Sequence, residues 1–282
     1  MADAKQPKVI LFDIGGVCVA SPFQTILDYE LSLGIPPGWI NFSISQTAPN
    51  GFWHRLERGH IPLDAAFLAG FTRDLNDEAR WQAFYQAAYQ KRKGKADELP
   101  LAAPPKPNVD GELLFNRMMR AADVPDPWML PALQTLSSSG RYILAALSNT
   151  VIFPPGHELH SDNFFAHPVR RLFDVFISSA HVGLRKPEPA IYQMALRETN
   201  AYAQKMASTT RGMANGWKHG VTASDILFLD DIGENLKFAK EQGFRTLKVE
   251  LGRSYEAVDR LEEITGLKLH GSYPRPHDKA RM

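Results

Sequence analysis

Residues 8–17 read KVILFDIGGV, and this stretch decides the fold. The short apolar run VILF closes on Asp13 and two glycines, as a buried strand does when it ends in a turn. Comparable apolar runs follow at residues 141–147, 173–178, 225–229 and 244–249. Helical patterns separate them, at residues 128–138, 190–200, 235–242 and 255–265. Strands that alternate with helices predict an α/β fold, a Rossmann-like parallel sheet with helices on both faces.

One long segment breaks this alternation. Residues 21–124 carry helical signals such as Phe67 and Phe71, spaced i and i+4. We expect a helical cap at residues 21–124, inserted into a core of residues 1–20 and 125–270, with a polar tail at 271–282. Within the cap, Asn76 is expected to be a helix N-cap. Residues 208–220 of the core are expected to form a surface loop.

The bulk composition narrows the class of protein. The chain has 282 residues, 44% of them hydrophobic and 22% charged, with a formal net charge of +1. This balance gives no reason to expect nucleic acid or membrane partners. The N-terminal apolar run is too short for a signal peptide and no window suits a membrane span, so we expect a cytoplasmic location. The ending Ala280-Arg281-Met282 resembles a peroxisomal address. The sequence does not decide whether the chain forms a homo-oligomer.

Four polar clusters end strands of the predicted sheet. The residues that chemistry would use are Asp13, Ser148 with Asn149, Lys186, and finally Asp230, Asp231 and Asn235. Each cluster alone is a common turn or cap. In an open parallel sheet, however, ligands bind at the carboxyl ends of the strands. Four clusters in order at that edge therefore predict one active site.

Phosphoryl transfer is the chemistry that suits these side chains. A carboxylate such as Asp13 can attack phosphorus and form an aspartyl-phosphate. Three nearby carboxylates repel each other and a phosphate, and a hard divalent cation, Mg²⁺ above all, relieves that repulsion. Lys186 adds a second positive charge, and Ser148 with Asn149 can hold phosphate oxygens. The expected partner is a small phosphorylated substrate.

The four clusters closely resemble the motifs of the haloacid dehalogenase superfamily. VILFDIGGV resembles motif I, ILAALSN motif II, RKPEPAIY motif III and ILFLDDIGENL motif IV. The inserted helices correspond to the type 1 cap of that superfamily. The wording is most similar to the phosphatase domain fused to soluble epoxide hydrolases, and to the domain that precedes some acyl-CoA dehydrogenases. The resemblance implies a magnesium-dependent phosphatase or related hydrolase.

Positions matched to the motifs receive roles by resemblance. Asp13 would be the nucleophile and a metal ligand. The Gly15 carbonyl and Asp231 would complete the protein ligands, with Asp230 beside them. As Lys186's neighbour, Arg185 is expected to point away from the site.

The remaining roles concern phosphate. Ser148 and Asn149 would bind it, and Lys186 would bridge it to the nucleophile. Asn235, one helical turn after Asp231, would orient that residue or Lys186.

Position 15 departs from the pattern. Phosphatases of this superfamily usually have a second aspartate there, which protonates the leaving oxygen and then activates water. General acid–base help is worth ~10²–10⁴-fold in rate. Gly15 therefore predicts weak activity on ordinary phosphomonoesters. It is compatible with acyl phosphates, with slow turnover, with an acid borrowed from the cap, or with no hydrolysis.

Three alternatives stay open. A metal-free dehalogenase would use the same aspartate, but it has no use for the pair Asp230-Asp231. A terpene cyclase, or diphosphate lyase, could read Asp230-Asp231-x-x-Glu234 as its acidic cluster and line a cavity with the aromatic residues of the cap. Those rings can equally be the packing core of the cap. The third alternative is a non-catalytic module that binds a phosphorylated ligand.

Overall fold

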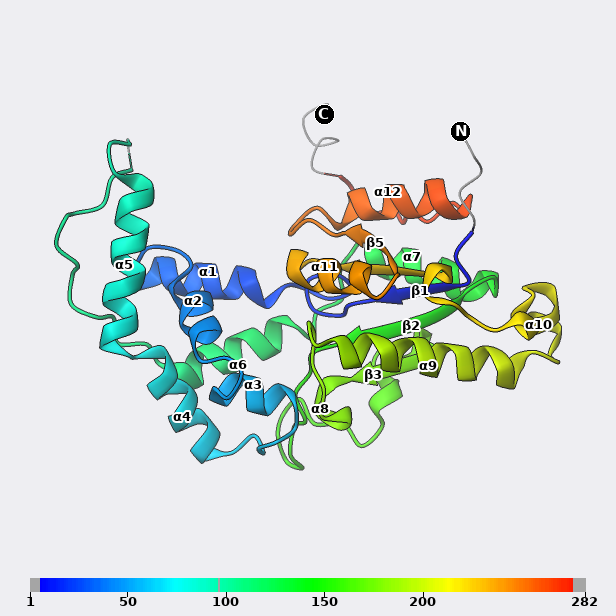
Figure 1. Ribbon diagram of the computed structural model, residues 1–282, viewed down its shortest axis with the longest axis horizontal. Coiled ribbons are helices and arrows are strands. Elements are labelled where there is room, and N and C mark those ends of the chain that lie inside the picture. The colour runs from blue at the N-terminus through cyan, green and yellow to red at the C-terminus, as the bar shows by residue number, and fades with distance from the viewer. Residues whose placement is uncertain (1–5, 96, 276–282) are drawn as a thin grey trace.

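The computed structural model describes residues 6–95 and 97–275. Five parallel strands form one sheet in the order β3-β2-β1-β4-β5 (Figure 1). Their bounds are β1 Val9–Phe12, β2 Ile143–Ser148, β3 Val175–Ser178, β4 Ile226–Asp230 and β5 Arg245–Lys248. Both ends of every strand lie within two residues of the ends that the sequence predicts. The predicted α/β fold is confirmed.

Apolar side chains fill both faces of this sheet. Alternate residues of β1, Ile10 and Phe12, pack on one face with helices α7 (Met129–Ser139) and α12 (Ser254–Thr265). Val9 and Leu11 pack on the other face with α9 (Pro189–Met206) and α11 (Gly233–Glu241). Burial on both faces explains why the strands read as continuous apolar runs rather than alternating ones.

Among the described residues, seven helices lie between β1 and β2 in the chain, and the first six of them form a layer beside the core (Figure 1). They are α1 Pro22–Ser32, α2 Trp39–Gln46, α3 Phe52–Glu57, α4 Ala65–Leu75, α5 Glu78–Arg92 and α6 Gly111–Ala121. The expectation for Asn76 is wrong, because Asp77 caps α5 while Asn76 ends α4 and donates to the Val109 carbonyl. The exact limits of core and cap stay a prediction.

The rest of the core differs from expectation at residues 208–220. They are not a simple surface loop: they hold α10 (Thr210–Ala214) and a 3₁₀ turn whose Trp217 is buried, stacked under Arg211. Residues 271–275, the described part of the predicted polar tail, are mostly exposed, and the Tyr273 ring lies 5.1 Å from that of Trp128. The short helices α8 Ser179–Val182, η1 Phe164–Ala166, η2 Arg170–Leu172, η3 Trp217–His219 and η4 Ala223–Asp225 complete the core.

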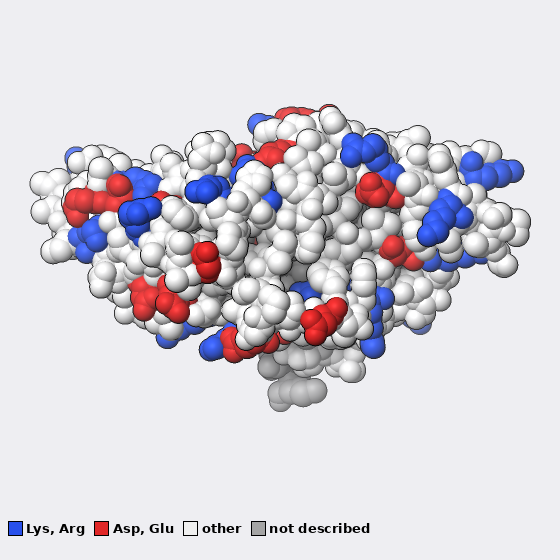
Figure 2. Space-filling view, turned by 90° about the horizontal axis from the view of Figure 1, so that it is seen from below, with Lys and Arg blue, Asp and Glu red and all other residues white. Residues whose placement is uncertain are grey.

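The structure bears on the expectations about membrane spans, charged surfaces and location only in part. Among the described residues, no helix is long and apolar enough to cross a membrane. On the face shown in Figure 2, basic and acidic residues are interspersed. The tripeptide Ala280-Arg281-Met282 lies outside the described residues.

Candidate active site

Parallel pairing of β1 with β4 brings the predicted acidic residues together. Phe12 is in register with Leu229, so Asp13 and Asp230 follow at the same edge of the sheet. The Asp13 amide donates to the Leu229 carbonyl at 2.8 Å, which continues the ladder to the nucleophile position. Carboxylate oxygens of Asp13, Asp230 and Asp231 lie within 4.8 Å of one another. The structure thus gathers all three acids.

Lys186 enters this group from the loop before α9. Its Nζ lies 2.7 Å from Asp13 Oδ2 and 2.7 Å from Asp230 Oδ2, and its side chain is 1% exposed. Burial alone would lower the pKa of Lys186, but Asp13 and Asp230 outweigh it and raise that pKa. Lys186 is therefore a fixed positive charge between two strand ends.

Asp230 supports the site rather than facing a ligand. It is fully buried, and its oxygens accept from the Lys186 ammonium, the Ile232 amide and the Asn235 amide group. Asn235, expected to orient Asp231 or Lys186, donates to Asp230 at 3.0 and 3.1 Å. It acts on Lys186 through the shared carboxylate.

Asn149 also holds the lysine loop. Its side chain accepts from the Lys186 amide at 2.9 Å and donates to the Lys186 carbonyl at 3.2 Å. Ser148, 3% exposed, is the last residue of β2, which is buried along its whole length. Both residues border a cavity, so the structure brings the predicted phosphate binders to the site.

Asp231 is shaped to receive a cation. Its Oδ1 is buried without a hydrogen-bond partner among the described residues. Gly16 has φ +75°, and a Cβ there would overlap Asp231 Oδ2. A buried orphan oxygen, close to the Asp13 carboxylate and kept clear by a glycine, suits a hard cation with oxygen ligands. Asp13 and Asp231 are the side chains that would hold it.

The charges of the cluster do not balance without a further cation. Three carboxylates surround one ammonium. Burial, followed by repulsion from Asp230 and Asp231, raises the pKa of Asp13 against the attraction of Lys186. Burial and Asp230 raise the pKa of Asp231 to about 6. A divalent cation would relieve both effects.

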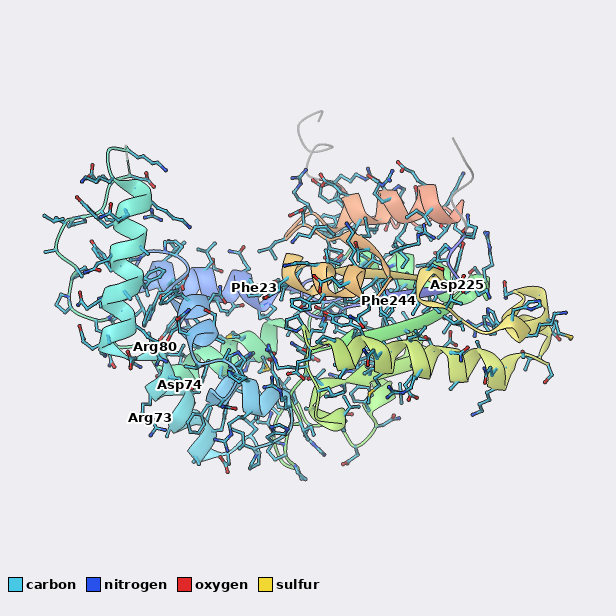
Figure 3. The ribbon with its side chains drawn as sticks, in the orientation of Figure 1. Phe23, Arg73, Asp74, Arg80, Asp225 and Phe244 are labelled. Carbon is cyan, nitrogen blue, oxygen red and sulfur yellow. The ribbon has the colours of Figure 1, made fainter. Side chains whose placement is uncertain are left out.

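Two adjoining cavities lie at the site, and the first of them opens onto this cluster. The nucleophile cavity, about 210 Å³, is lined by Asp13, Lys186 and Asp231 from the core and by Phe23 of α1, which lies where cap meets core (Figure 3). The side cavity, about 170 Å³, is lined by apolar residues and by Ser148, Asp123 and Arg170. Residues shared by both are Gly15, Pro22, Trp53, Glu57 and Asn149.

Two residues of the site were missed or misjudged from the sequence. Glu57, at the end of cap helix α3, is 7% exposed and borders both cavities. Its Oε2 lies 2.8 Å from Arg185 Nε and 2.7 Å from Arg185 Nη2. The expectation that Arg185 points away is wrong, because Glu57 draws it into the nucleophile cavity. No spacing in the sequence marks either residue.

Gly15 is not required by the backbone. Its φ lies outside the left-handed region, and the nearest atom to an added Cβ is Pro22 Cδ at 3.8 Å. A side chain would fit there, in contrast to Gly16. The difference from the usual aspartate is therefore a chemical one.

The aromatic residues of the cap pack mostly on each other. Phe67 and Phe71 stack at 5.6 Å, and Trp39 meets Trp81 edge-on at 5.3 Å. The cyclase alternative rests on eight rings of the cap, which are Trp39, Phe42, Phe52, Trp53, Phe67, Phe71, Trp81 and Phe84. Of these eight, only Trp53 borders either cavity described above, and Phe23 of α1 borders the first. Glu234 is exposed and borders neither. The packing-core interpretation of these rings is the one that the contacts support.

Comparison with known proteins gives distant similarity over nearly the whole chain. No family model matches. Acyl-CoA dehydrogenase family member 10 of Mus musculus is 25% identical over 269 residues, which are 95% of this chain and 20% of that protein. Bifunctional epoxide hydrolase 2 of Sus scrofa is 23% identical over 263 residues, 93% of this chain and 39% of that protein. The chain thus spans only a fifth to two fifths of these relatives.

Solved structures match this chain at lower sequence identity. A predicted HAD-like family hydrolase from Porphyromonas gingivalis is 18% identical with a TM-score of 0.49, covering 91% of this chain and 98% of that one. A HAD family enzyme from Bacteroides thetaiotaomicron, solved as a magnesium complex, is 17% identical with a TM-score of 0.49, covering 91% and 100%. The predicted resemblance to epoxide hydrolase and acyl-CoA dehydrogenase proteins is confirmed as a similarity of sequence.

Proposed function

We propose that this protein is a magnesium-dependent hydrolase of the haloacid dehalogenase type that acts on a small phosphorylated metabolite through an aspartyl-phosphate at Asp13. The observation that carries the proposal is the position of Lys186, 2.7 Å from both Asp13 and Asp230 beside the nucleophile cavity. Similarity to epoxide hydrolase 2 and to acyl-CoA dehydrogenase family member 10 supports the same family.

The side chains of the site have separate tasks in this proposal. Asp13 attacks phosphorus with one oxygen while Lys186 neutralises the charge that gathers on the nucleophile and the phosphate. Ser148, which borders the side cavity, would donate to a phosphate oxygen. Asp13 and Asp231 would hold Mg²⁺, and this ion would supply positive charge to offset the negative charge of substrate and site. Asn149, Asp230 and Asn235 hold Lys186 in place.

The size of the cavities favours a small substrate. At about 210 and 170 Å³, the two adjoining cavities together lie near the lower end of the ~300–1,000 Å³ typical of pockets for drug-sized ligands. A long prenyl diphosphate needs a larger apolar chamber, and the rings of the cap are occupied with packing. We therefore prefer the hydrolase to the cyclase.

A substrate panel tests the proposal. Phosphate release is measured with Mg²⁺ on alkyl monophosphates, acyl phosphates and diphosphates, for the wild type and for Asp13→Asn. We expect release on at least one class in the wild type, weakest on alkyl monophosphates, and none in the variant. No release on any class, or equal release by Asp13→Asn, would contradict the proposal. Products of prenyl diphosphates are analysed in parallel, and a hydrocarbon product would favour the cyclase.

A further inference from the structure

The site as described lacks a group that could give a proton to a leaving oxygen. Asp13 is the nucleophile, Asp230 is fully engaged, and Asp231 faces the cation position. Gly15 has no side chain. A second titratable group must border the same cavity if an alkoxide is to leave as an alcohol.

Glu57 meets the geometric conditions for that group. It comes from the cap, yet it borders the nucleophile cavity together with Asp13 and Gly15, and also the side cavity with Ser148. Both contacts from Arg185 fall on Oε2, and the Trp53 indole also donates to this carboxylate. The Glu57 side chain is buried, and it borders the space that a substrate would enter.

The core fixes the end of α3 and so fixes this carboxyl. Ser179 Oγ donates to the Glu57 carbonyl at 2.5 Å, and a Cβ on Gly59 would overlap the Ala180 backbone. Arg58 forms an ion pair with Glu188 of the core beside it. Helix α3 is therefore seated where a cap closed over substrate would need it.

Resting on the proposed function, we propose that Glu57 is the general acid and base of the reaction, supplied by the cap in place of the aspartate missing at position 15. In the first step Asp13 forms its bond to phosphorus, the bond to the leaving oxygen breaks, and that oxygen takes the electron pair and the Glu57 proton. In the second, water attacks phosphorus and gives a proton to Glu57. The electron pair of the broken bond returns to Asp13, and phosphate leaves.

The surroundings suit a carboxyl that alternates between two states. Burial raises the pKa of Glu57, while Arg185, Lys186 and the Trp53 indole lower it, and the net direction is upward. Arg58 and His54 are the other basic groups on the same helix. Activity that needs the protonated form is expected to fall as pH rises through this raised pKa.

A rescue experiment in the full-length protein tests Glu57 as acid. We compare kcat/KM for an alkyl phosphate and an acyl phosphate, because only the first has a leaving group that needs a proton. Glu57→Gln is expected to lower the alkyl value by ~10²–10⁴-fold and the acyl value by less than about tenfold. Gly15→Asp in the Glu57→Gln background should restore most of the alkyl value, since position 15 has room for a side chain.

A matched control separates catalysis from cap seating. Glu158→Gln removes a different cap–core ion pair, the exposed one with Arg120 of α6, and Glu158 borders neither cavity, so this variant should change both values little. Equal losses on both substrates in Glu57→Gln without rescue would mean that Glu57 only seats the cap, and would overturn the inference. Unchanged alkyl activity in Glu57→Gln would overturn it too, while the hydrolase proposal survives. A wild type that releases phosphate from the acyl phosphate but not from the alkyl phosphate would also overturn the inference alone, whereas release from no class of the panel would overturn the hydrolase proposal as well.

Discussion

The Nζ of Lys186 lies 2.7 Å from Asp13 Oδ2, and the two residues come from motifs 173 positions apart in the chain (186 − 13). A charge pair this buried contributes to stability only while both partners are present. The same ammonium also reaches Asp230. Lys186 therefore links the fold of the core to the chemistry of the site.

Removal of this ammonium should destabilise the protein as well as inactivate it. Lys186→Met leaves two buried carboxylates without their cation, a change that typically costs about 3–5 kcal/mol in the free energy of unfolding. Urea denaturation without Mg²⁺ measures the loss. Adding Asp230→Asn to Lys186→Met removes one stranded charge and should recover part of it. A Lys186→Met protein as stable as the wild type would contradict the described geometry.

Substitution by alanine should affect Mg²⁺ binding at Gly16 but not at Gly15. Gly16→Ala places a Cβ against Asp231 Oδ2 in a left-handed conformation, whereas Gly15→Ala makes only an ordinary contact with Pro22 Cδ at 3.8 Å. We expect Gly16→Ala to weaken Mg²⁺ binding, measured by titration calorimetry, by at least about tenfold. Gly15→Ala is the matched control and should bind Mg²⁺ as the wild type does. Equal affinities in both variants would remove Asp231 from the cation site.

Magnesium should stabilise the folded chain through Asp231. A ligand at ~100 times its Kd adds about 2.7 kcal/mol to the free energy of unfolding. Thermal melting with and without Mg²⁺ should show this in the wild type and lose it in Asp231→Asn. Asp259→Asn is the control, because Asp259 belongs to a separate acidic group with Glu262 and His270. If that variant loses the shift instead, the cation binds elsewhere.

A fall in pH should lower the free energy of unfolding through protonation of His54. Burial, with repulsion from Arg185 and Arg58, lowers the pKa of this buried residue to about 4. A folded pKa below the unfolded value means that its contribution is present above pH ~6.5 and is lost as pH falls toward 4. We expect His54→Gln to lose about 1–3 kcal/mol less than the wild type between those pH values, measured by urea denaturation. Parallel curves for the two proteins would show that His54 is not responsible.

Much of the core site follows from the sequence because it depends on strand ends. Asp13, Ser148 and Asp230 end parallel strands, and parallel pairing places such ends at one edge of a sheet. The roles of the supporting residues were less accessible. That Asn149 grips the Lys186 backbone, and that Asn235 acts on Asp230, depends on loop conformations that no periodic pattern encodes.

The residue that the cap brings to the site could not be predicted from the sequence. Glu57 is the last residue of a helix of only six residues, and a glutamate at a helix end is usually exposed to solvent. Its burial arises from the way α3 docks on the core, through contacts with Ser179 and Arg185 more than 120 positions away. Arg185 was misjudged for the same reason, because its partner lies in the inserted domain.

The most direct measurement is whether Asp13 becomes phosphorylated during turnover. The wild type is mixed with Mg²⁺ and the best substrate of the panel, quenched in acid within a turnover, and analysed by peptide mass spectrometry. We predict one phosphoryl group on the peptide that contains Asp13, and none in Asp13→Asn. Phosphate release without any phosphopeptide, or a phosphoryl group on another residue, would contradict the central claim.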